Sequence, residues 1–346
     1  MKELLKELSL EFGPSGCEDR VREKIKQKIA DYIDGYEVIE DGLGNLIIHI
    51  GGNGPKLMVS AHMDEVGFMV TGILENGLIK VGTVGGIDPV CLSARRVISE
   101  SGVLGSIISK PIHLLSREER TQAPKLKNLS IDIGASTKDE AEKLTFVGDY
   151  FTFDSDYREY GEGLVKCKAL DDRLGCAIMC QLLKDIKNEK IEPKYDLYFA
   201  FTTREEIGFS GAYGASMRIK PLYAVIIESK AVADIAGVSE DKEVCRLGDG
   251  VIISYADRGT IYDRDFIRHI KKLADKKEIK NQVNKYISGG NDSMHIQKNA
   301  YGTKVSTLSC ASRYIHSQSD VIHLDDVDAT YKTVLEIITN DAPTKE

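Results

Sequence analysis

Five apolar, strand-like runs in this chain each end in a short motif that carries a carboxylate or a histidine. The motifs are Ala61–Glu65 (AHMDE), Leu170–Arg173 (LDDR), Arg204–Glu206 (REE), Ile227–Ser229 (IES) and Tyr314–Ser317 (YIHS). In open α/β sheets, functional sites assemble at the carboxyl ends of the strands. Imidazole nitrogens and carboxylate oxygens are ligands for divalent cations. The pattern therefore predicts an α/β fold in which these side chains converge on a site for two metal ions.

Length and composition narrow the classes of protein that fit. The 346 residues exceed what one hydrophobic core usually takes, so two domains are expected. The net charge of -8 argues against nonspecific nucleic-acid binding. No apolar run approaches the roughly 20 residues that span a bilayer, so no membrane association is expected. Seven cysteines, an odd number without a C-x-x-C pair, fit a reducing cytoplasm.

Helix-like and strand-like segments alternate before residue 66 and again after residue 163. The first stretch predicts a hairpin around the turn Asp41–Asn45. It also predicts a capping box in which Ser15 caps a helix and Glu18 reaches back. Strands are predicted at 56–60, 196–202, 223–227 and 304–308, and helices at 174–186, 266–274 and 327–338.

The stretch between these two regions has a different texture. Gly, Val, Ile and Ser recur there in short runs, and no long amphipathic helix is evident. This texture predicts a small β-rich domain inserted into the α/β domain. The predicted boundaries are 1–66 plus 163–346 for the α/β domain and 67–162 for the insertion.

His62 and Asp64 are separated by one residue, which places both side chains on one face of an extended chain. His62 is then a candidate metal ligand, and Asp64 is the carboxylate that fixes its tautomer. A solvated histidine in a turn is the alternative, and the motif alone supports both interpretations equally.

The two acid pairs are ambiguous when each is considered alone. Asp171 and Asp172 precede a helix, where Asp commonly caps the first turn. Alternatively, one of them bridges two metal ions while Arg173 neutralises the other. Glu205 and Glu206 close an apolar strand, either as solvated turn residues or as a metal ligand beside a general base.

Two isolated side chains complete the candidate set. Glu228 follows an uninterrupted apolar run, where a buried carboxylate is costly unless it is paired or coordinated. Exposure at the end of the strand is the alternative. His316 lies in a loop and is weak evidence by itself. The other five histidines, at positions 49, 113, 269, 295 and 323, receive no metal role.

Considered in order, the motifs resemble those of the tetrahedral (TET) aminopeptidases, which include the glutamyl aminopeptidases, within the co-catalytic zinc exopeptidases. The resemblance covers nearly the whole chain. Besides the motifs above, it is carried by the runs Gly13–Gly16, Asp41–Asn45, Lys110–Leu115 and Gly289–Asp292. It implies a three-layer α/β/α catalytic domain of the zinc-exopeptidase type with an inserted β-rich dimerisation domain.

The resemblance also implies the members of the metal site. The implied ligands of two divalent ions (Zn²⁺, Co²⁺ or Mn²⁺) are His62, Asp171, Glu206, Glu228 and His316. Asp171 would bridge the ions, with His62 and Glu228 on one and the remaining two on the other. Glu228 stands where the family often has Asp.

Three further features follow from the resemblance. Glu205 would be the general base that deprotonates the attacking water, and Asp64 would orient His62. A cis peptide bond is implied between Asp171 and Asp172. Asn291 stands where Thr is common in the family, and its role is left open.

The implied activity is removal of single N-terminal residues from short peptides. The insertion would mediate dimers, from which the family builds a hollow tetrahedral homododecamer. A glycosidase of the endoglucanase type is one rival class, but its two carboxyl groups must flank a sugar bond roughly 5–9.5 Å apart. Glu205 and Glu206, which are adjacent, cannot easily do so. Two more rival classes are an amidohydrolase acting on N-acyl amino acids and a non-catalytic metal- or peptide-binding assembly protein.

Overall fold

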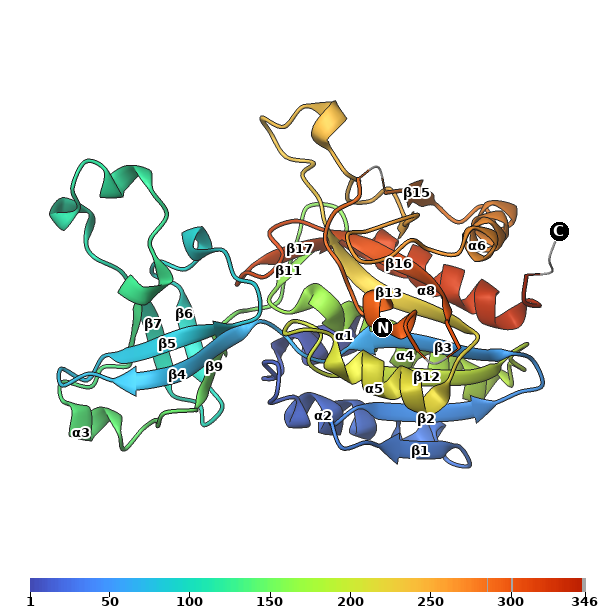
Figure 1. Cartoon of the computed structure of the whole chain (residues 1–346), viewed down its shortest axis with the longest axis horizontal. Helices are drawn as coiled ribbons and strands as arrows, with labels where there is room; N and C mark the ends of the chain where they lie inside the picture. The colour runs from blue at the N-terminus through green and yellow to red at the C-terminus, as the bar shows by residue number, and fades with distance from the viewer. Residues whose placement is uncertain (285, 300, 344–346) are drawn as a thin grey trace.

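The computed structural model describes residues 1–284, 286–299 and 301–343, and Figure 1 shows a small β-rich part beside a larger α/β part. Within these residues the strands form an eight-stranded sheet, a three-stranded sheet and a closed six-stranded barrel. Of the described helices, none combines the length and apolar character that a bilayer crossing requires.

The eight-stranded sheet is the centre of the α/β part. In spatial order its strands are β1 (Glu37–Glu40), β2 (Leu46–Gly51), β12 (Asp196–Thr202), β3 (Lys56–His62), β13 (Tyr223–Ala231), β16 (Lys304–Ser312), β14 (Val251–Ile253) and β15 (Asn281–Val283). The four central strands β12, β3, β13 and β16 are parallel to one another. Their apolar runs are buried almost throughout, as expected for strands that are covered on both faces.

Helices pack on both faces of this sheet and make a three-layer α/β/α arrangement. The helices of this part are α1 (Lys2–Leu10), α2 (Asp19–Ile29), α4 (Leu170–Glu189), α5 (Ser210–Ile219), α6 (Arg264–Lys276), α7 (Ser293–Ile296) and α8 (Leu324–Thr339). Helices α4 and α8 pack on each other and on the central strands, and so do α5 and α7. The predicted fold class is therefore confirmed.

The barrel has a core of its own. Its strands are β4 (Gly67–Ile73), β5 (Ile79–Val84), β6 (Arg96–Ser99), β7 (Leu104–Ile108), β8 (Ser130–Asp132) and β9 (Tyr150–Phe153), with the short helix α3 (Lys138–Ala141) beside them. Phe68, Phe151 and Phe153 are buried in its interior. The chain then returns through β10 (Arg158–Tyr160) and β11 (Leu164–Cys167), which join β17 (Asp320–His323) in the three-stranded sheet. The exact domain boundaries stay a prediction.

Candidate metal centre

The carboxyl ends of the parallel strands bring the five motifs together. His62 is the last residue of β3, and Glu228 lies in the second half of β13. Glu205 and Glu206 lie in the loop that follows β12, and His316 lies in the loop that follows β16. Asp171 is at the start of α4, where the peptide bond to Asp172 is cis, as the resemblance implies.

The two carboxylate oxygens of Asp171 face two different histidines. Its Oδ1 lies 3.4 Å from His62 Nε2, and that nitrogen lies 3.5 Å from Glu228 Oε1. Its Oδ2 lies 3.1 Å from His316 Nε2, and that nitrogen lies 3.1 Å from Glu206 Oε1. Asp171 thus stands between two His–Glu pairs.

Each histidine is held through the ring nitrogen that faces away from Asp171. His316 Nδ1 is 2.7 Å from the carbonyl oxygen of Gly86, in the segment that follows β5. His62 Nδ1 is 3.1 Å from the carbonyl oxygen of Asp64 and 3.4 Å from its Oδ1. Nδ1–H donation to these oxygens leaves both Nε2 atoms as acceptors, which is the tautomer that a metal ligand needs.

The carboxylate of Asp64 also holds the loop that carries the two glutamates. It accepts hydrogen bonds from the backbone N–H groups of Glu205 (3.0 Å) and Glu206 (3.1 Å), and from the hydroxyl of Ser15 (2.6 Å). Asp64 therefore links the end of β3 to this loop.

The predicted capping box is wrong because its members bond to this region instead. Helix α2 begins at Asp19 without a side-chain cap. Ser15 donates to Asp64, and Glu18 Oε1 accepts from the backbone N–H groups of Gly16 (2.8 Å) and Arg204 (3.1 Å). The Ser15 hydroxyl donates to the charged carboxylate of Asp64 instead of accepting from a helix N–H group, and the sequence spacing does not reveal this distant partner.

In one interpretation of the sequence, Arg173 neutralises one of the two neighbouring acids. In the structure its guanidinium has other partners. Its buried guanidinium donates to the carbonyl oxygens of Leu8 (2.6 Å), Glu11 (3.2 Å) and Gly13 (3.3 Å). It also lies 3.5 Å from Glu65, which pairs with Lys168 at 2.6 Å. This arginine fastens the N-terminal segment to α4.

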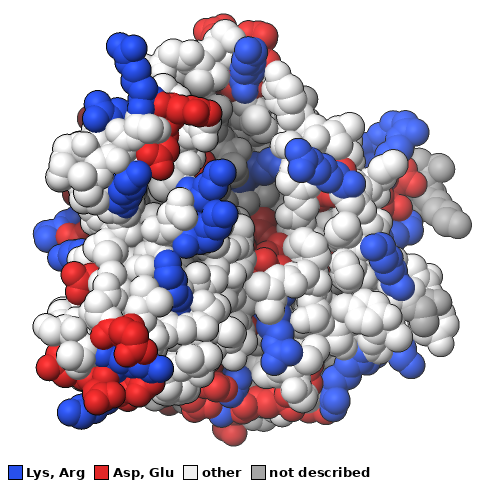
Figure 2. All heavy atoms as spheres, turned by 60° about the vertical axis from the view of Figure 1, so that its left-hand side comes forward, with Lys and Arg blue, Asp and Glu red and all other residues white. Residues whose placement is uncertain are grey.

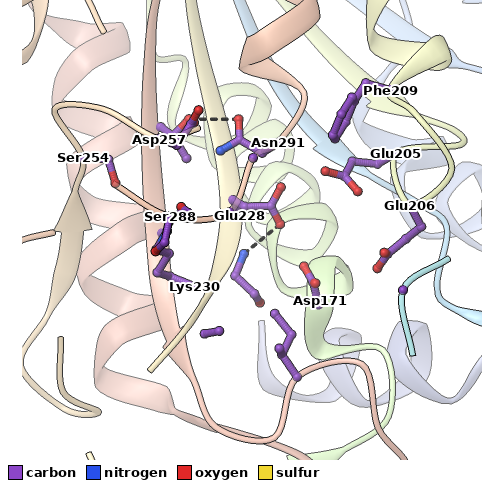
Figure 3. Close-up of a pocket in the computed structure, with 18 of the residues that line it drawn as sticks. Asp171, Glu205, Glu206, Phe209, Glu228, Lys230, Ser254, Asp257, Ser288 and Asn291 are labelled. Carbon is purple, nitrogen blue, oxygen red and sulfur yellow. Dashed lines mark hydrogen bonds between the residues drawn. The ribbon is translucent and has the colours of Figure 1, made fainter. Parts of the chain in front are cut away.

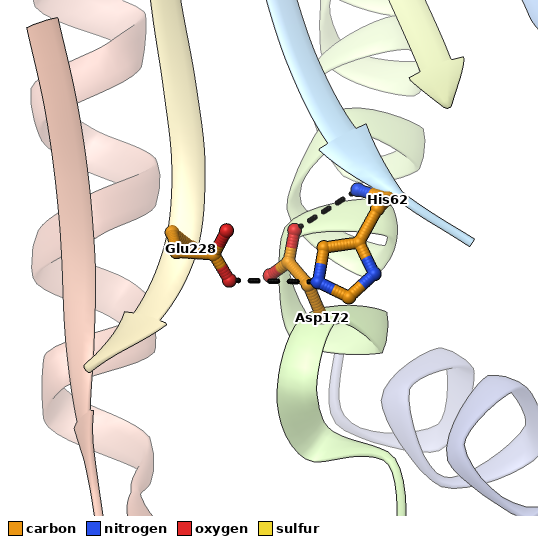
Figure 4. A group of neighbouring side chains, drawn as sticks. All are labelled: His62, Asp172 and Glu228. Atoms are coloured by element: carbon orange, nitrogen blue, oxygen red, sulfur yellow. Dashed lines mark hydrogen bonds and ion pairs between the residues drawn. The ribbon is translucent and has the colours of Figure 1, made fainter. Parts of the chain in front are cut away.

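Buried carboxylates without partners test whether the site fits metal ions. Among the described residues, Asp171 Oδ1 and Glu228 Oε2 are buried without a hydrogen-bond partner, a costly state that a cation would relieve. Two groups of residues each offer three ligand atoms that lie within 4.8 Å of one another. They are His62, Asp172 and Glu228 (Figure 4), and His62, Asp171 and Glu206. A donor set of imidazoles and carboxylates suits Zn²⁺, Co²⁺ or Mn²⁺. The residues present therefore fit a pair of divalent ions.

Asp172 is a weaker candidate for the shared ligand than Asp171. Its Oδ2 accepts from the backbone N–H of His62 (3.2 Å), and its Oδ1 accepts from that of Gly175 (3.1 Å). Both oxygens are thus engaged in holding the ends of β3 and α4 together.

The crowded carboxyl groups shift one another's titration. Burial raises the pKa of Glu205 well above its usual range, and Glu228 and Glu206 add to the rise although His62 opposes it. Burial lowers the pKa of His316, but its bonds with Asp171 and Glu206 raise it to about 12. Without other cations, Glu205 and His316 therefore hold their protons to a higher pH than the free groups do.

The acids open into a cavity of about 510 Å³. Figure 2 shows a hollow on this face, with acidic side chains at its floor and Lys and Arg around its rim. Asp171, Glu205, Glu206 and Glu228 line one end of the cavity, next to Phe209 (Figure 3). A substrate group entering the cavity therefore meets the two His–Glu pairs.

The model of the M42 glutamyl aminopeptidase family matches residues 44–333. The chain belongs to this family. A putative aminopeptidase of Acetivibrio thermocellus is 33% identical over 98% of both chains. The lysyl aminopeptidase of Pyrococcus furiosus is 31% identical over 95% of this chain and 94% of its own. Membership confirms the predicted class, a metal-dependent aminopeptidase.

Solved structures agree with the family. The TET aminopeptidase of a marine-sediment Thaumarchaeota archaeon superposes with a TM-score of 0.94 at 30% identity, over 98% of this chain and 96% of its own. The TET1 peptidase of Pyrococcus horikoshii, which assembles into a tetrahedron or a large octahedral shell, superposes with a TM-score of 0.87 at 32% identity, over 98% and 99%. A Thermotoga maritima protein named an endoglucanase superposes less closely, with a TM-score of 0.79 at 34% identity, over 96% of both chains.

Three charged residues near the acid cluster were not identified as site residues from the sequence. Asp292 is buried and accepts from Thr202 Oγ1 (2.9 Å), and burial raises its pKa to about 7. Asp320 is a buried acid near His316. Its position beside an apolar run was the only sign of it in the sequence. Lys230 lies two residues after Glu228, and this strand spacing was its signal. Asn291, whose role the sequence left open, accepts from Ser293 N (2.9 Å) and so shapes the cavity wall.

Proposed function

We propose that this protein removes single N-terminal residues from short peptides, at a site where Asp171 is shared between two divalent ions. The observation that carries the proposal is the division of the Asp171 carboxylate between two His–Glu pairs. His62 and Glu228 would hold one ion, and Glu206 and His316 the other. Asp64 would fix the ring of His62 and the backbone of the glutamate loop.

Glu205 is proposed as the general base. It lines the cavity beside the two His–Glu pairs but belongs to neither. Ions held by the pairs would supply Lewis acidity, which polarises the scissile carbonyl and brings the pKa of an attacking water toward neutrality. The Glu205 carboxylate then takes a proton from that water and passes it to the leaving amine.

The acid-lined end of the cavity supports an exopeptidase. A free α-ammonium group is attracted by the surrounding carboxylates, and binding it places the first peptide bond beside Glu205. An internal peptide bond has no such charge to offer. Cleavage would therefore remove one residue at a time from the N-terminus.

The substitution Glu205→Gln tests the assignment of the base. Gln keeps the size of the side chain but cannot accept a proton, so kcat should fall roughly 100- to 10,000-fold. The metal content, measured by elemental analysis, should stay at the wild-type value. Glu192→Gln, at an exposed position, is the matched control. Full peptidase activity in Glu205→Gln with intact metal content would refute the role.

The two rival enzyme classes predict different substrates. An endoglucanase would release reducing sugar from cellulose in the presence of a chelator, and an amidohydrolase would prefer N-acyl amino acids. We expect neither activity, because the cavity end holds imidazole–carboxylate pairs suited to metal ions. Reconstitution of the metal-free protein with Zn²⁺, Co²⁺ and Mn²⁺ in turn would identify the native metal, which we propose is one of these three.

The assembly is proposed to be a tetrahedral homododecamer built from dimers that associate through the barrel part. Large apolar side chains are exposed there and fit such an interface. They are Val90, Leu104, Ile112, Leu114, Phe146 and Val147. Sedimentation velocity should give a particle of about twelve chains, and a clean monomer would contradict the proposal. The cysteine pattern supports a cytoplasmic location for such a particle.

A further inference from the structure

The cavity continues beyond the acid cluster into a second, mixed end. Figure 3 shows Lys230, Ser254 and Ser288 on one side of Glu228, with Glu205, Glu206 and Phe209 on the other. In the proposed aminopeptidase the scissile bond occupies the acid end. The mixed end is then available to the side chain of the first residue.

Lys230 is placed on the wall of this mixed end by strand geometry. It follows Glu228 by two residues on β13, so both side chains leave the same face of the strand. Their Cα atoms are therefore roughly 6.6 Å apart along the strand. That separation suits a peptide whose reacting carbonyl lies at Glu228 while its first side chain points along β13.

The ammonium group of Lys230 has spare binding capacity. In the described part of the chain its hydrogen-bond partner is the carbonyl oxygen of Ser288, at 2.7 Å. Among the described residues no carboxylate oxygen lies within 4.0 Å of it. It is also the one Lys or Arg among the described residues that line the cavity. Asp257 and Glu228 attract this half-buried cation from beyond 4.0 Å, but its direct partner is a neutral carbonyl oxygen, so an anionic ligand group can be stabilised there.

Asp257 is the carboxylate at this end, but its oxygens are occupied. Oδ1 accepts from the backbone N–H groups of Gly259 and Thr260, both at 2.7 Å. Oδ2 accepts from the hydroxyl of Tyr262 at 2.5 Å. Asp257 therefore shapes the wall and has less capacity than Lys230 for an incoming charge.

We infer that Lys230 selects an acidic first residue, Glu or Asp, by pairing with its side-chain carboxylate. This inference rests on the proposed aminopeptidase function. Family membership does not decide the matter, because the family is named for glutamyl aminopeptidases while a similar relative is a lysyl aminopeptidase. The choice is made by a residue of this chain.

The test compares substrates that differ only in charge. The metal-loaded protein is assayed with the amidated tripeptides Glu-Ala-Ala and Gln-Ala-Ala, and the ratio of their kcat/KM values is the readout. In wild type the ratio should favour Glu. In Lys230→Met, which keeps the aliphatic stem, the ratio should fall roughly 10- to 100-fold. Lys230→Arg should keep the preference, and Lys272→Met, at an exposed position on α6, is the matched control.

A second arm distinguishes the source of the carboxylate. Lys230 could instead bind the C-terminal carboxylate of a dipeptide, so Leu-Ala is compared with Leu-Ala amide in wild type and Lys230→Met. An effect confined to this pair would overturn the side-chain assignment. A kcat/KM ratio that does not favour the Glu peptide in wild type would also overturn it. So would a ratio that stays unchanged in Lys230→Met, and Lys230→Arg serves as a second variant if Lys230→Met fails to fold. Hydrolysis of Leu-Ala amide without Glu preference would leave the aminopeptidase standing, whereas no hydrolysis of any peptide would refute both.

Discussion

At the scale of single residues, the hydrogen-bond partners of each carboxylate oxygen decide which role an acid can have. Oδ1 of Asp171 has no hydrogen-bond donor, whereas both oxygens of Asp172 accept hydrogen bonds from backbone N–H groups. The oxygens of Asp64 accept hydrogen bonds from a hydroxyl and two backbone N–H groups. The proposed shared ligand is thus the acid that keeps one oxygen without a donor, and the supporting acids are those whose oxygens all have donors.

Asp64→Asn should weaken metal binding without removing a proposed ligand. An amide has one acceptor oxygen, so it cannot serve Ser15, Glu205 and Glu206 as the carboxylate does. We expect a loss of roughly 10- to 100-fold in metal affinity or activity, measured by metal titration of the metal-free enzyme. Asp139→Asn, at an exposed position on α3, is the control. Unchanged titration of Asp64→Asn would show that Asp64 supports nothing at the site.

At the scale of elements, the sequence predicts what is local and loses what depends on distant partners. The continuous apolar runs of β12, β3 and β13 were predictable because buried parallel strands need no alternation. The capping box failed because Ser15 finds Asp64, 49 positions away. The partners of Arg173 were also hidden, since they are carbonyl oxygens of the N-terminal segment, which any residue type could offer.

Arg173→Met should loosen the contact between that N-terminal segment and α4. The arginine is fully buried, and its loss would leave three carbonyl oxygens and part of the charge of Glu65 unpaired. We expect the free energy of unfolding to fall by about 3–5 kcal/mol, measured by urea denaturation. Arg218→Met, at an exposed position on α5, should change it little. Equal stability of the two variants would contradict this view of the segment.

At the scale of the whole molecule, the barrel part and the α/β part meet at the site. Gly86, which follows the barrel strand β5, accepts from His316 in the α/β part. Thr152 of β9 donates to Glu65, which pairs with Lys168. The convergence of the motifs was predictable from strand ends, but this support from the inserted part was not, since it depends on where two separate folds touch.

The stability of the metal-free protein should fall as the pH rises. Burial holds the pKa values of Glu205, Glu228 and Asp320 well above their unfolded values. The folded state therefore binds more protons than the unfolded chain above pH about 4.5, and it loses stability as these groups ionise. His316, with its pKa raised to about 12, acts in the same direction above its unfolded pKa of about 6.5. Thermal unfolding should be measured between pH 6 and 9 for the metal-loaded and the chelator-stripped protein. The Tm should decline more steeply with pH in the stripped protein, and parallel declines of Tm would contradict the account.

The most direct measurement is the number of ions bound per chain. The protein is stripped with chelator, titrated with Zn²⁺ or Co²⁺, and followed by calorimetry and peptidase activity in parallel. Sharing of Asp171 predicts two ions per chain in wild type and in Glu205→Gln, with full activity only in wild type at the second equivalent. It also predicts that Asp171→Asn weakens both ions together. Full activity with one ion per chain, or an Asp171→Asn variant that binds two ions as tightly as wild type, would contradict the two-metal site.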